Sequence, residues 1–595
     1  MEKHLVHMMR NRAVRYGARE VFRYREPGET EYRSYNWPEL VSITNQVAKA
    51  LLSLGFGPGS KIGIFSDNKP QWTLADLGIL AIRGIVVPFF ATASKPQLKY
   101  IVDETCMEIL FVGNREQLEK ALWLFGNSDS LKKIVCFFES ISADEDARCM
   151  SWDEFLKLGE SGTYGQRLEQ ILLEAEPDDL ATIIYTSGTT GEPKGVMLDH
   201  DNFISCIINH DERLQVTEKD VSLCFLPLSH IFERAWTFYM LHKGAINVYL
   251  GNPRAVIEEL PLAKPTLMCT VPRFFEKTLE GIRSEETRWA PGKRKIFEWA
   301  ILAGEEYSAY LKDSKRPPLG VRFRRSIADK LVLKKVRSVF GGNIRFLPCA
   351  GAAIRPELLW FFHAAGIFVN YGYGATETTA TVSCFRNDVY EFEASGTVMP
   401  GTQVKISDQG EILIKGPTVF KGYYNKPDET ARVLIDGWYH SGDLGKFTEA
   451  GNLLMLDRIN DIFKTSGGKF VSPQKVELLL CRDPFIEQAI VLGDNRKFIS
   501  ALIVPSFDTL KSQLADIIST IPDEKSVVAH APVQEFYRKR LELIQEELIP
   551  YEKVVKFTLL SEPFSIENEI LTSTLKIRRK VIYSKYQELI DSMYL

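Results

Sequence analysis

The first half of the chain alternates short apolar runs with segments in which apolar residues recur at helical spacing. Four continuous apolar runs have the length of strands: KIGIFSD (61–67), GIVVPFF (84–90), MEILFVG (107–113) and KIVCFFE (133–139). Between the first two, QWTLADLGILAIRG (71–84) has helical spacing. This alternation predicts an α/β domain built on a mostly parallel sheet. The polar, acidic stretch 140–176 that follows is expected to be a surface excursion.

The pattern changes after about residue 395 to shorter, alternating β-type segments. QVKISDQGEILIKG (403–416) predicts a hairpin that turns at DQG. Further on, 529–549 places apolar residues on one side of a helix. We therefore expect a large, multi-lobed α/β N-terminal domain with additional β segments, residues 1–457, and a small α+β C-terminal domain, residues 460–595.

Composition and charge fit a soluble globular protein of several lobes. The chain has 595 residues, of which 45% are hydrophobic, and a formal net charge of −4, which gives no indication of a nucleic-acid partner. Its nine cysteines include no C-x-x-C pair, so neither a zinc site nor a disulfide framework is indicated. With no signal peptide evident, we expect a cytoplasmic protein.

Two segments raise the question of a membrane. The apolar window 74–93 is long enough to span a bilayer, but Arg83 and Pro88 favour a buried helix–strand unit. The stretch 312–337 is helical and strongly basic. It is either a solvated helical face or a surface that binds anionic membrane from the cytoplasmic side.

The stretch YTSGTTGEPKG (185–195) follows the apolar run DDLATIIYT and suits a polyphosphate. Backbone N–H groups in a glycine-rich turn, hydroxyl groups and one lysine are donors to an anion. The P-loop pattern G-x-x-x-x-G-K-[ST] does not match, because Lys194 is followed by Gly195. The candidate phosphate ligands are Thr186, Ser187, Gly188, Thr189, Thr190, Gly191 and Lys194.

The whole string resembles the phosphate-loop signature of the adenylate-forming (AMP-binding) superfamily. Five further stretches resemble its other signatures in the same order: LPLSHIFER (226–234), NYGYGATET (370–378), GWYHSGDLG (437–445), DRINDIFKTSGGK (457–469) and LTSTLKIRRK (571–580). The resemblance covers essentially the whole chain. PLSHIFER, the basic helical stretch and the TLKIRRK ending are most similar to the long-chain fatty-acyl-CoA synthetase branch.

The resemblance implies a two-step reaction with ATP, Mg²⁺ and coenzyme A. A fatty acid of medium or long chain is first joined to AMP, and coenzyme A then displaces AMP to give acyl-CoA. The superfamily's C-terminal domain is mobile and rotates between the two steps. Two alternatives remain open: an acyl-AMP ligase that delivers its product to a carrier protein, and a catalytically silent lipid-binding relative.

The resemblance also assigns roles to individual residues. Lys576 is the main cation of the adenylation step, with a solvated basic run as its alternative. Glu377 holds Mg²⁺, a cation that prefers oxygen ligands, and Thr376 donates to the α-phosphate. His230 lies near the fatty-acid carboxylate or has a structural role only.

The nucleotide residues follow from the same resemblance. Tyr373 presents its ring to adenine, or is a buried aromatic at a strand end. Gly351 and Ala352 let the base approach the backbone closely. Asp443 accepts from the ribose hydroxyls, and Arg458 contacts the nucleotide or belongs to a surface turn. Trp236 and the apolar run after it could line an acyl tunnel or belong to the core. Asn460 stands where relatives usually carry an aspartate or lysine hinge residue, so the hinge position is left open.

Overall fold

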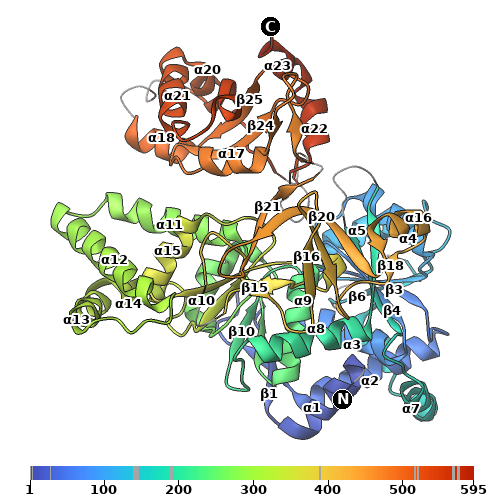
Figure 1. Ribbon diagram of the computed structural model, residues 1–595. Coiled ribbons are helices and arrows are strands. Elements are labelled where there is room, and N and C mark those ends of the chain that lie inside the picture. Colours follow the sequence, from blue (N-terminus) through green and yellow to red (C-terminus); the bar gives the residue numbers. More distant parts are fainter. Residues whose placement is uncertain are drawn as a thin grey trace.

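The computed structural model places a large N-terminal part below a smaller C-terminal part, which is drawn in orange to red (Figure 1). It describes all residues except 1, 3, 27, 139–145, 187–191, 387–389, 460, 515–517, 519–520, 566–567, 569 and 572–576. The strand β21 (Leu453–Arg458) ends next to the C-terminal part. The expected fold class, with a large α/β part followed by a small α+β part, is confirmed.

The first sheet contains the strands expected in the first half of the chain. Its order is β18-β9-β8-β4-β3-β5-β6-β7. Its strands are β3 (Lys61–Phe65), β4 (Ile85–Phe89), β5 (Ile109–Val112), β6 (Lys133–Cys136), β7 (Cys149–Ser151), β8 (Leu180–Thr186), β9 (Lys194–Asp199) and β18 (Gly422–Tyr423). The run from β8 to β7 is parallel, whereas β9 and β18 are antiparallel to their neighbours.

Helices cover both faces of this sheet. The helices α2 (Trp37–Ser53) and α3 (Pro70–Ala81) share a core with Ile62 and Ile64, while α4 (Lys95–Thr105) and α5 (Arg115–Leu124) share another with Val87 and Leu110. Successive side chains of a strand point to opposite faces of the sheet. A continuous apolar run therefore packs against the helices on both faces.

The window 74–93 forms the expected helix–strand unit. Helix α3 ends at Ala81, and β4 begins at Ile85 after a turn in which Arg83 has φ 56°. Arg83 Nε donates to Asp179 Oδ2 at 2.7 Å, so the charge within the window lies at the surface end of the unit. In the part of the chain that the structure describes, no helix is both long and apolar enough to cross a bilayer.

The prediction of a surface excursion at 140–176 is wrong from residue 149 onward. β7 extends the first sheet, and it is followed by α6 (Trp152–Leu158) and α7 (Gly165–Leu173). The rings of Trp152 and Phe155 lie 6.2 and 5.3 Å from that of Phe111, with Phe155 fully buried. The acidic composition of the stretch led to a surface prediction, although Trp152 and Phe155 belong to the core.

Two further groups of strands form the other side of the N-terminal part. One has the order β10-β11-β1-β2 and the other β12-β13-β14-β15. These strands are β1 (Glu20–Tyr24), β2 (Arg33–Asn36), β10 (Val221–Cys224), β11 (Ile246–Tyr249), β12 (Phe346–Cys349), β13 (Phe368–Tyr373), β14 (Ser383–Cys384) and β15 (Thr397–Val398). The helices α8 (His200–Arg213) and α9 (Ile231–Lys243) share a core with residues of this side and of the first sheet.

A helical lobe projects from this side, at the left in Figure 1. It contains α11 (Pro272–Thr287), α12 (Pro291–Leu311), α13 (Leu319–Ala328), a π-helical segment (Asp329–Leu333), α14 (Lys334–Ser338) and α15 (Pro356–Ala364). The helical structure expected within 312–337 is present as α13, the π-helical segment and α14, which follow one another without a break.

The third sheet and the C-terminal part complete the fold. The predicted hairpin is formed by β16 (Gln403–Ile406) and β17 (Glu411–Lys415), which join β20 (Trp438–Phe447) and β21 in one antiparallel sheet. The C-terminal part has β24 (Ile486–Leu492), β25 (Ile499–Pro505) and β26 (Val554–Leu559) with α17 (Pro473–Leu480) and α21 (Ala531–Ile544) around its own core. Arg273 Nη2 contacts Glu487 Oε1 across the two parts at 3.0 Å.

Candidate functional site

The glycine-rich loop connects two antiparallel strands of the first sheet. Thr186 ends β8 and lies opposite Lys194, the first residue of β9. Ser187, Gly188, Thr189, Thr190 and Gly191 lie outside the described residues. Lys194 Nζ lies 2.6 Å from Glu429 Oε2 and 5.1 Å from the centre of the Tyr423 ring. The Lys194 ammonium lowers the pKa of the Glu429 carboxyl. Lys194 therefore already holds an anionic oxygen in this structure.

Three of the predicted nucleotide residues come together where two sheets meet. Tyr373 ends β13, while Asp443 and Arg458 lie opposite each other on β20 and β21. The Tyr373 hydroxyl donates to Asp443 Oδ2 at 2.5 Å, and Arg458 Nε lies 3.4 Å from Asp443 Oδ1. Burial and the Asp443 charge raise the pKa of Tyr373 well above its usual value. The cluster therefore places the Asp443 carboxylate and the Arg458 guanidinium next to the end of β13.

Glu377 and Thr376 lie on the short 3-10 helix that follows β13. Glu377 Oε1 accepts from the Tyr423 hydroxyl at 2.9 Å, which connects it to the loop lysine through Tyr423. Thr376 is largely buried. A carboxylate oxygen is the type of ligand that Mg²⁺ prefers, usually together with waters and substrate phosphates rather than a full set of protein groups. Among the described residues, no group of three or more His, Cys, Asp or Glu side chains is placed to hold a metal ion.

Gly351 and Ala352 lie on the turn directly after β12. Gly351 has φ 94°, a conformation that favours glycine, and a Cβ added there would meet only Val271 Cγ1 at 4.0 Å. The backbone oxygen of Ala352 accepts from the Tyr371 hydroxyl at 3.3 Å. Both residues are exposed, so the turn leaves open space beside its backbone.

His230 is the N-cap of helix α9. Its Nδ1 accepts from the backbone N–H of Phe232 at 3.2 Å. His230 therefore caps the helix, which is a structural role. The same bond fixes the imidazole at the N-terminus of α9, and the first turns of this helix line the pocket described below. Lys576, expected to be the main catalytic cation, and Asn460, at the expected hinge, lie outside the described residues.

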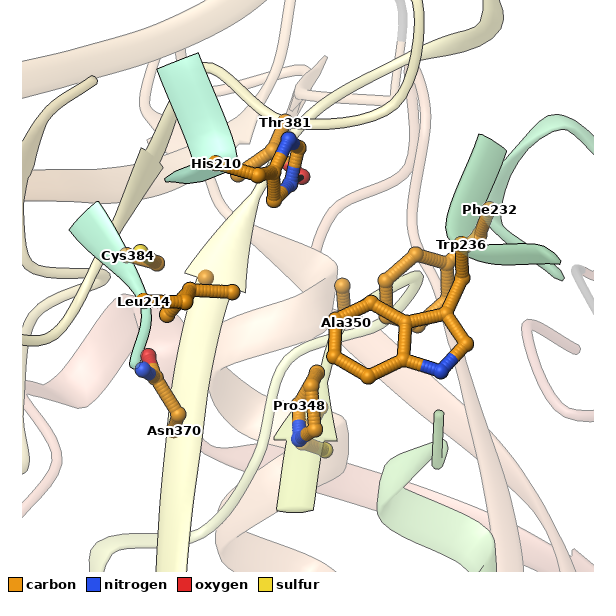
Figure 2. Close-up of a pocket in the computed structure, with 11 residues that line it drawn as sticks. His210, Leu214, Phe232, Trp236, Pro348, Ala350, Asn370, Thr381 and Cys384 are labelled. Carbon is orange, nitrogen blue, oxygen red and sulfur yellow. Dashed lines mark hydrogen bonds between the residues drawn. The ribbon is translucent and has the colours of Figure 1, made fainter. Parts of the chain in front are cut away.

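An apolar pocket lies between α8, α9 and the strands β12, β13 and β14 (Figure 2). Its lining consists of His210, Leu214, Phe232, Trp236, Pro348, Cys349, Ala350, Asn370, Gly372, Thr381 and Cys384. The cavity measures about 20 Å³, which is space for about one water molecule. A ligand of more than about one or two heavy atoms would need these side chains to move apart.

Trp236 belongs to the hydrophobic core and also lines this pocket. It is 3% exposed and donates from Nε1 to Ser222 Oγ at 2.9 Å, and its ring also forms one wall of the pocket (Figure 2). On the other side, His210 donates from Nδ1 to the carbonyl oxygen of Cys206 at 2.7 Å. Burial lowers the pKa of His210, which keeps the ring neutral, so Nε2 accepts from the Thr381 hydroxyl at 3.1 Å.

Several relevant side chains were not singled out from the sequence. Tyr423 and Glu429, which contact Glu377 and Lys194, follow them by 46 and 235 residues, and no local pattern connects the pairs. Glu233 is fully buried in the first turn of α9, and burial raises its pKa to about 8. A charged residue inside the run IFERAWTFYML was a visible signal that this helix carries a buried carboxyl group.

Comparisons with known proteins agree with this arrangement. The family model described as AMP-binding enzyme matches residues 9–424, and that described as AMP-binding enzyme C-terminal domain matches 460–595. The chain is 29% identical to the fatty acyl-CoA synthetase A of Dictyostelium discoideum, over 97% of this chain and 88% of that one. It is 30% identical to the human long-chain-fatty-acid–CoA ligase 1, over 95% and 82% of the two chains.

Among solved structures, the o-succinylbenzoate CoA synthetase of Bacillus subtilis, in complex with its acyl-adenylate intermediate, superposes with a TM-score of 0.69. The two chains are 20% identical, and the match covers 96% of this chain and 97% of that chain. At this identity the likeness concerns the fold.

Proposed function

Because the chain belongs to the AMP-binding, adenylate-forming enzyme family, we propose that it activates a medium- or long-chain fatty acid with ATP and transfers the acyl group to coenzyme A. The observation that carries this proposal is the junction of two sites. The Tyr373–Asp443–Arg458 cluster lies at the end of β13, and the apolar pocket lies further back along the same strand.

In the first step a carboxylate oxygen attacks the α-phosphorus of ATP and expels pyrophosphate. Asp443 is suited to accept from the ribose hydroxyls, since a carboxylate is a two-oxygen acceptor. Lys194 and the glycine-rich loop are suited to the outer phosphates. When bound, Mg²⁺ offsets the negative charge of the phosphates, and Glu377 is the residue proposed to hold it.

The arrangement around Lys194 fits an exchange of partners. Lys194 holds Glu429 at 2.6 Å, and both side chains are about one-third exposed, so this ion pair is weak. A triphosphate carries more negative charge than one carboxylate and attracts Lys194 more strongly. We expect Lys194 to leave Glu429 for the phosphates and to return when pyrophosphate departs.

Lys576 is proposed as the cation that stabilises the charge developing on the α-phosphate. In the second step the sulfur of coenzyme A attacks the acyl carbon and AMP leaves. We propose that the two steps alternate by rotation of the C-terminal domain, with the division between residues 457 and 460. In the present arrangement Arg273 and Lys277 on α11 contact Glu487 of the C-terminal part, at 3.0 and 3.5 Å.

Mass spectrometry of a single reaction tests the proposed products. With ATP, palmitate, Mg²⁺ and coenzyme A, palmitoyl-CoA and AMP should form in equal amounts. Accumulation of palmitoyl-AMP without thioester would instead support a ligase that serves a carrier protein. Absence of both products with every acid of a panel would support a silent lipid-binding relative.

We further propose that the helical lobe binds an anionic membrane surface, from which a fatty acid can be taken up. Four apolar side chains follow one another at i, i+4 spacing along α13 and the π-helical segment: Leu319, Phe323, Ile327 and Leu331, exposed to 79%, 69%, 37% and 50%. At this spacing they form one stripe on the helix. An exposed apolar stripe on a basic segment is typical of helices that lie in a membrane interface.

The charges around the stripe are complementary to acidic lipids. Residues 312–337 contain ten Lys and Arg against two Asp, although the whole chain is acidic. Five of the ten make no ion pair in the part of the chain that is described: Arg316, Arg322, Lys330, Lys334 and Lys335. Each basic residue near an anionic surface contributes about 1 kcal/mol. The lobe lies at the outer edge of the molecule, where a flat surface can reach it (Figure 1).

Flotation with vesicles tests this surface. The protein should bind vesicles rich in phosphatidylserine, less so at high salt, and Phe323→Ser should weaken that binding. Val14→Ser and Leu173→Ser are matched controls, because these residues are 87% and 86% exposed but lie away from the basic segment. Equal binding of all four proteins, or no binding at low salt, would contradict the proposal.

A further inference from the structure

Among the described residues, one polar side chain in the wall of the pocket has no hydrogen-bond partner. Asn370 lies on β13, is 3% exposed, and neither Nδ2 nor Oδ1 meets a donor or acceptor in the described part of the chain. Among the pocket's other polar side chains, His210 and Thr381 are bonded to each other at 3.1 Å, and Trp236 donates to Ser222 Oγ at 2.9 Å. Asn370 therefore differs from its polar neighbours in having its full hydrogen-bonding capacity available.

The backbone around Asn370 gives its amide a defined place in the pocket. Asn370 lies opposite Pro348 in the parallel pair β12–β13, and Gly372, on the same face of β13, also lines the pocket. A Cβ on Gly372 would come within 2.6 Å of the backbone oxygen of Ser383, so this position cannot carry a side chain unless the neighbouring strand shifts. Tyr373 lies three residues further on, which is about 10 Å along a strand.

A buried amide without partners lowers stability, because it has left water without gaining new hydrogen bonds. The cavity of about 20 Å³ can hold about one water molecule that satisfies it. A substrate that displaces this water must supply a hydrogen-bonding group of its own, or it leaves the amide unpaired again. A plain hydrocarbon chain has no such group, whereas a hydroxyl or a ketone oxygen does.

We propose that Asn370 is a specificity-determining residue that selects fatty acids with a hydroxyl or oxo group on the chain. This inference rests on the proposed function, since it takes the pocket to be the acyl site. The distance along β13 places the substituent well away from the carboxyl group, which must reach the nucleotide residues at the strand end. The amide can donate to an oxo oxygen or both donate to and accept from a hydroxyl group.

The test compares acids of equal length with and without the substituent. Pyrophosphate release is measured in the wild type and in Asn370→Leu. The acids are octadecanoate, its mid-chain hydroxy and oxo derivatives, and its 3-hydroxy derivative. The wild type should show a kcat/KM at least about tenfold higher for the mid-chain derivatives than for the plain acid. Asn370→Leu should reverse this preference and keep or raise the melting temperature, because an unpaired buried amide is gone.

Two further variants control for a general change in the pocket wall and for the size of the leucine side chain. Leu214→Met changes the apolar wall at similar volume and should affect all the acids alike. Asn370→Ala should reverse the preference as Asn370→Leu does, and it avoids the larger side chain. A wild type that prefers the plain acid, or an Asn370→Leu variant that changes all acids equally, would overturn the proposal.

Failure of the proposed function gives a different result. If no acid leads to pyrophosphate release, the same acids are compared by the rise in melting temperature that each produces without ATP. A larger rise with the substituted acids, lost in Asn370→Leu, still supports the selectivity of the pocket. Equal rises, or none, overturn it.

Discussion

The Tyr373 hydroxyl donates to Asp443 Oδ2 at 2.5 Å, although the two residues lie 70 positions apart and in different sheets. Both are nearly buried, with 8% and 5% of their surface exposed. This hydrogen bond joins the end of β13 to β20, the two elements that carry the predicted adenine and ribose contacts. It links the Asp443 carboxylate directly to the end of β13.

Tyr373→Phe keeps the aromatic ring and removes the hydroxyl group. We expect kcat/KM for ATP to fall about tenfold, because Asp443 loses a partner that orients it. Tyr390→Phe is the control, since it removes a buried hydroxyl that lies 3.2 Å from His363 Nδ1, away from the nucleotide residues. Steady-state kinetics with varied ATP distinguish the two. Equal losses in both variants would mean that the effect is general destabilisation.

Lys194→Ala should weaken the use of ATP with little effect on stability. The ion pair with Glu429 is partly exposed, so its loss should change the free energy of unfolding by about 1 kcal/mol or less. The loss of a cation for the phosphates should lower kcat/KM for ATP by about 10- to 100-fold. Lys132→Ala, which removes an exposed lysine paired with Glu108, is the control. An unchanged kcat/KM in Lys194→Ala would remove the loop lysine from the site.

Lys576→Ala should separate the two half-reactions. Adenylation should be lost, at a cost of a few kcal/mol in transition-state stabilisation, while thioester formation from added acyl-AMP should persist. Pyrophosphate release reports the first step and acyl-CoA formation from acyl-AMP reports the second. Lys580→Ala, in the same basic run, should leave both steps intact. Loss of both steps together in Lys576→Ala would contradict its assignment.

Glu233 should make stability depend on pH. Burial raises its pKa from 4.5 to about 8 in the folded protein, so the unfolded chain releases its proton first as the pH rises. The contribution of Glu233 to stability is therefore complete below pH 4.5 and declines until about pH 8. Glu233→Gln resembles the protonated carboxyl but does not titrate.

Melting temperatures of the wild type and Glu233→Gln, measured from about pH 5 to pH 9, give the test. The stability of the variant relative to the wild type should increase as the pH rises and level off above about pH 8. The full pKa shift corresponds to a difference of about 5 kcal/mol at most in the free energy of unfolding. Two curves that run parallel over the whole range would show that Glu233 does not titrate differently in the folded state.

The sequence was a good guide to which segments form the parallel strands of the first sheet. The strands β3, β4, β5 and β6 are short, continuous apolar runs that alternate with helical segments. Runs of this length are too short for a buried helix and therefore indicate buried strands. It was a poor guide between 146 and 176, where acidic residues outnumber the aromatic ones. Trp152 and Phe155 reach the core because their helix presents them on one face, which average polarity does not reveal.

The site was predictable only as far as its residues belong to contiguous signatures. Asp443 and Arg458 stand in two of these, and the antiparallel pairing of β20 with β21 brings them opposite each other. The contacts of Lys194 with Glu429 and of Glu377 with Tyr423 depend on how separate segments fold together. Asn370 lies within a quoted signature, yet its missing hydrogen bonds become visible only when its neighbours are placed.

Exchange of labelled pyrophosphate into ATP tests the central claim most directly, because it reports acyl-adenylate formation without requiring coenzyme A. With Mg²⁺ and a panel of fatty acids, exchange should occur only when an acid that fits the pocket is present, and it should disappear in Lys576→Ala. A protein that is folded and binds ATP, yet gives no exchange above background with any acid, would contradict the account.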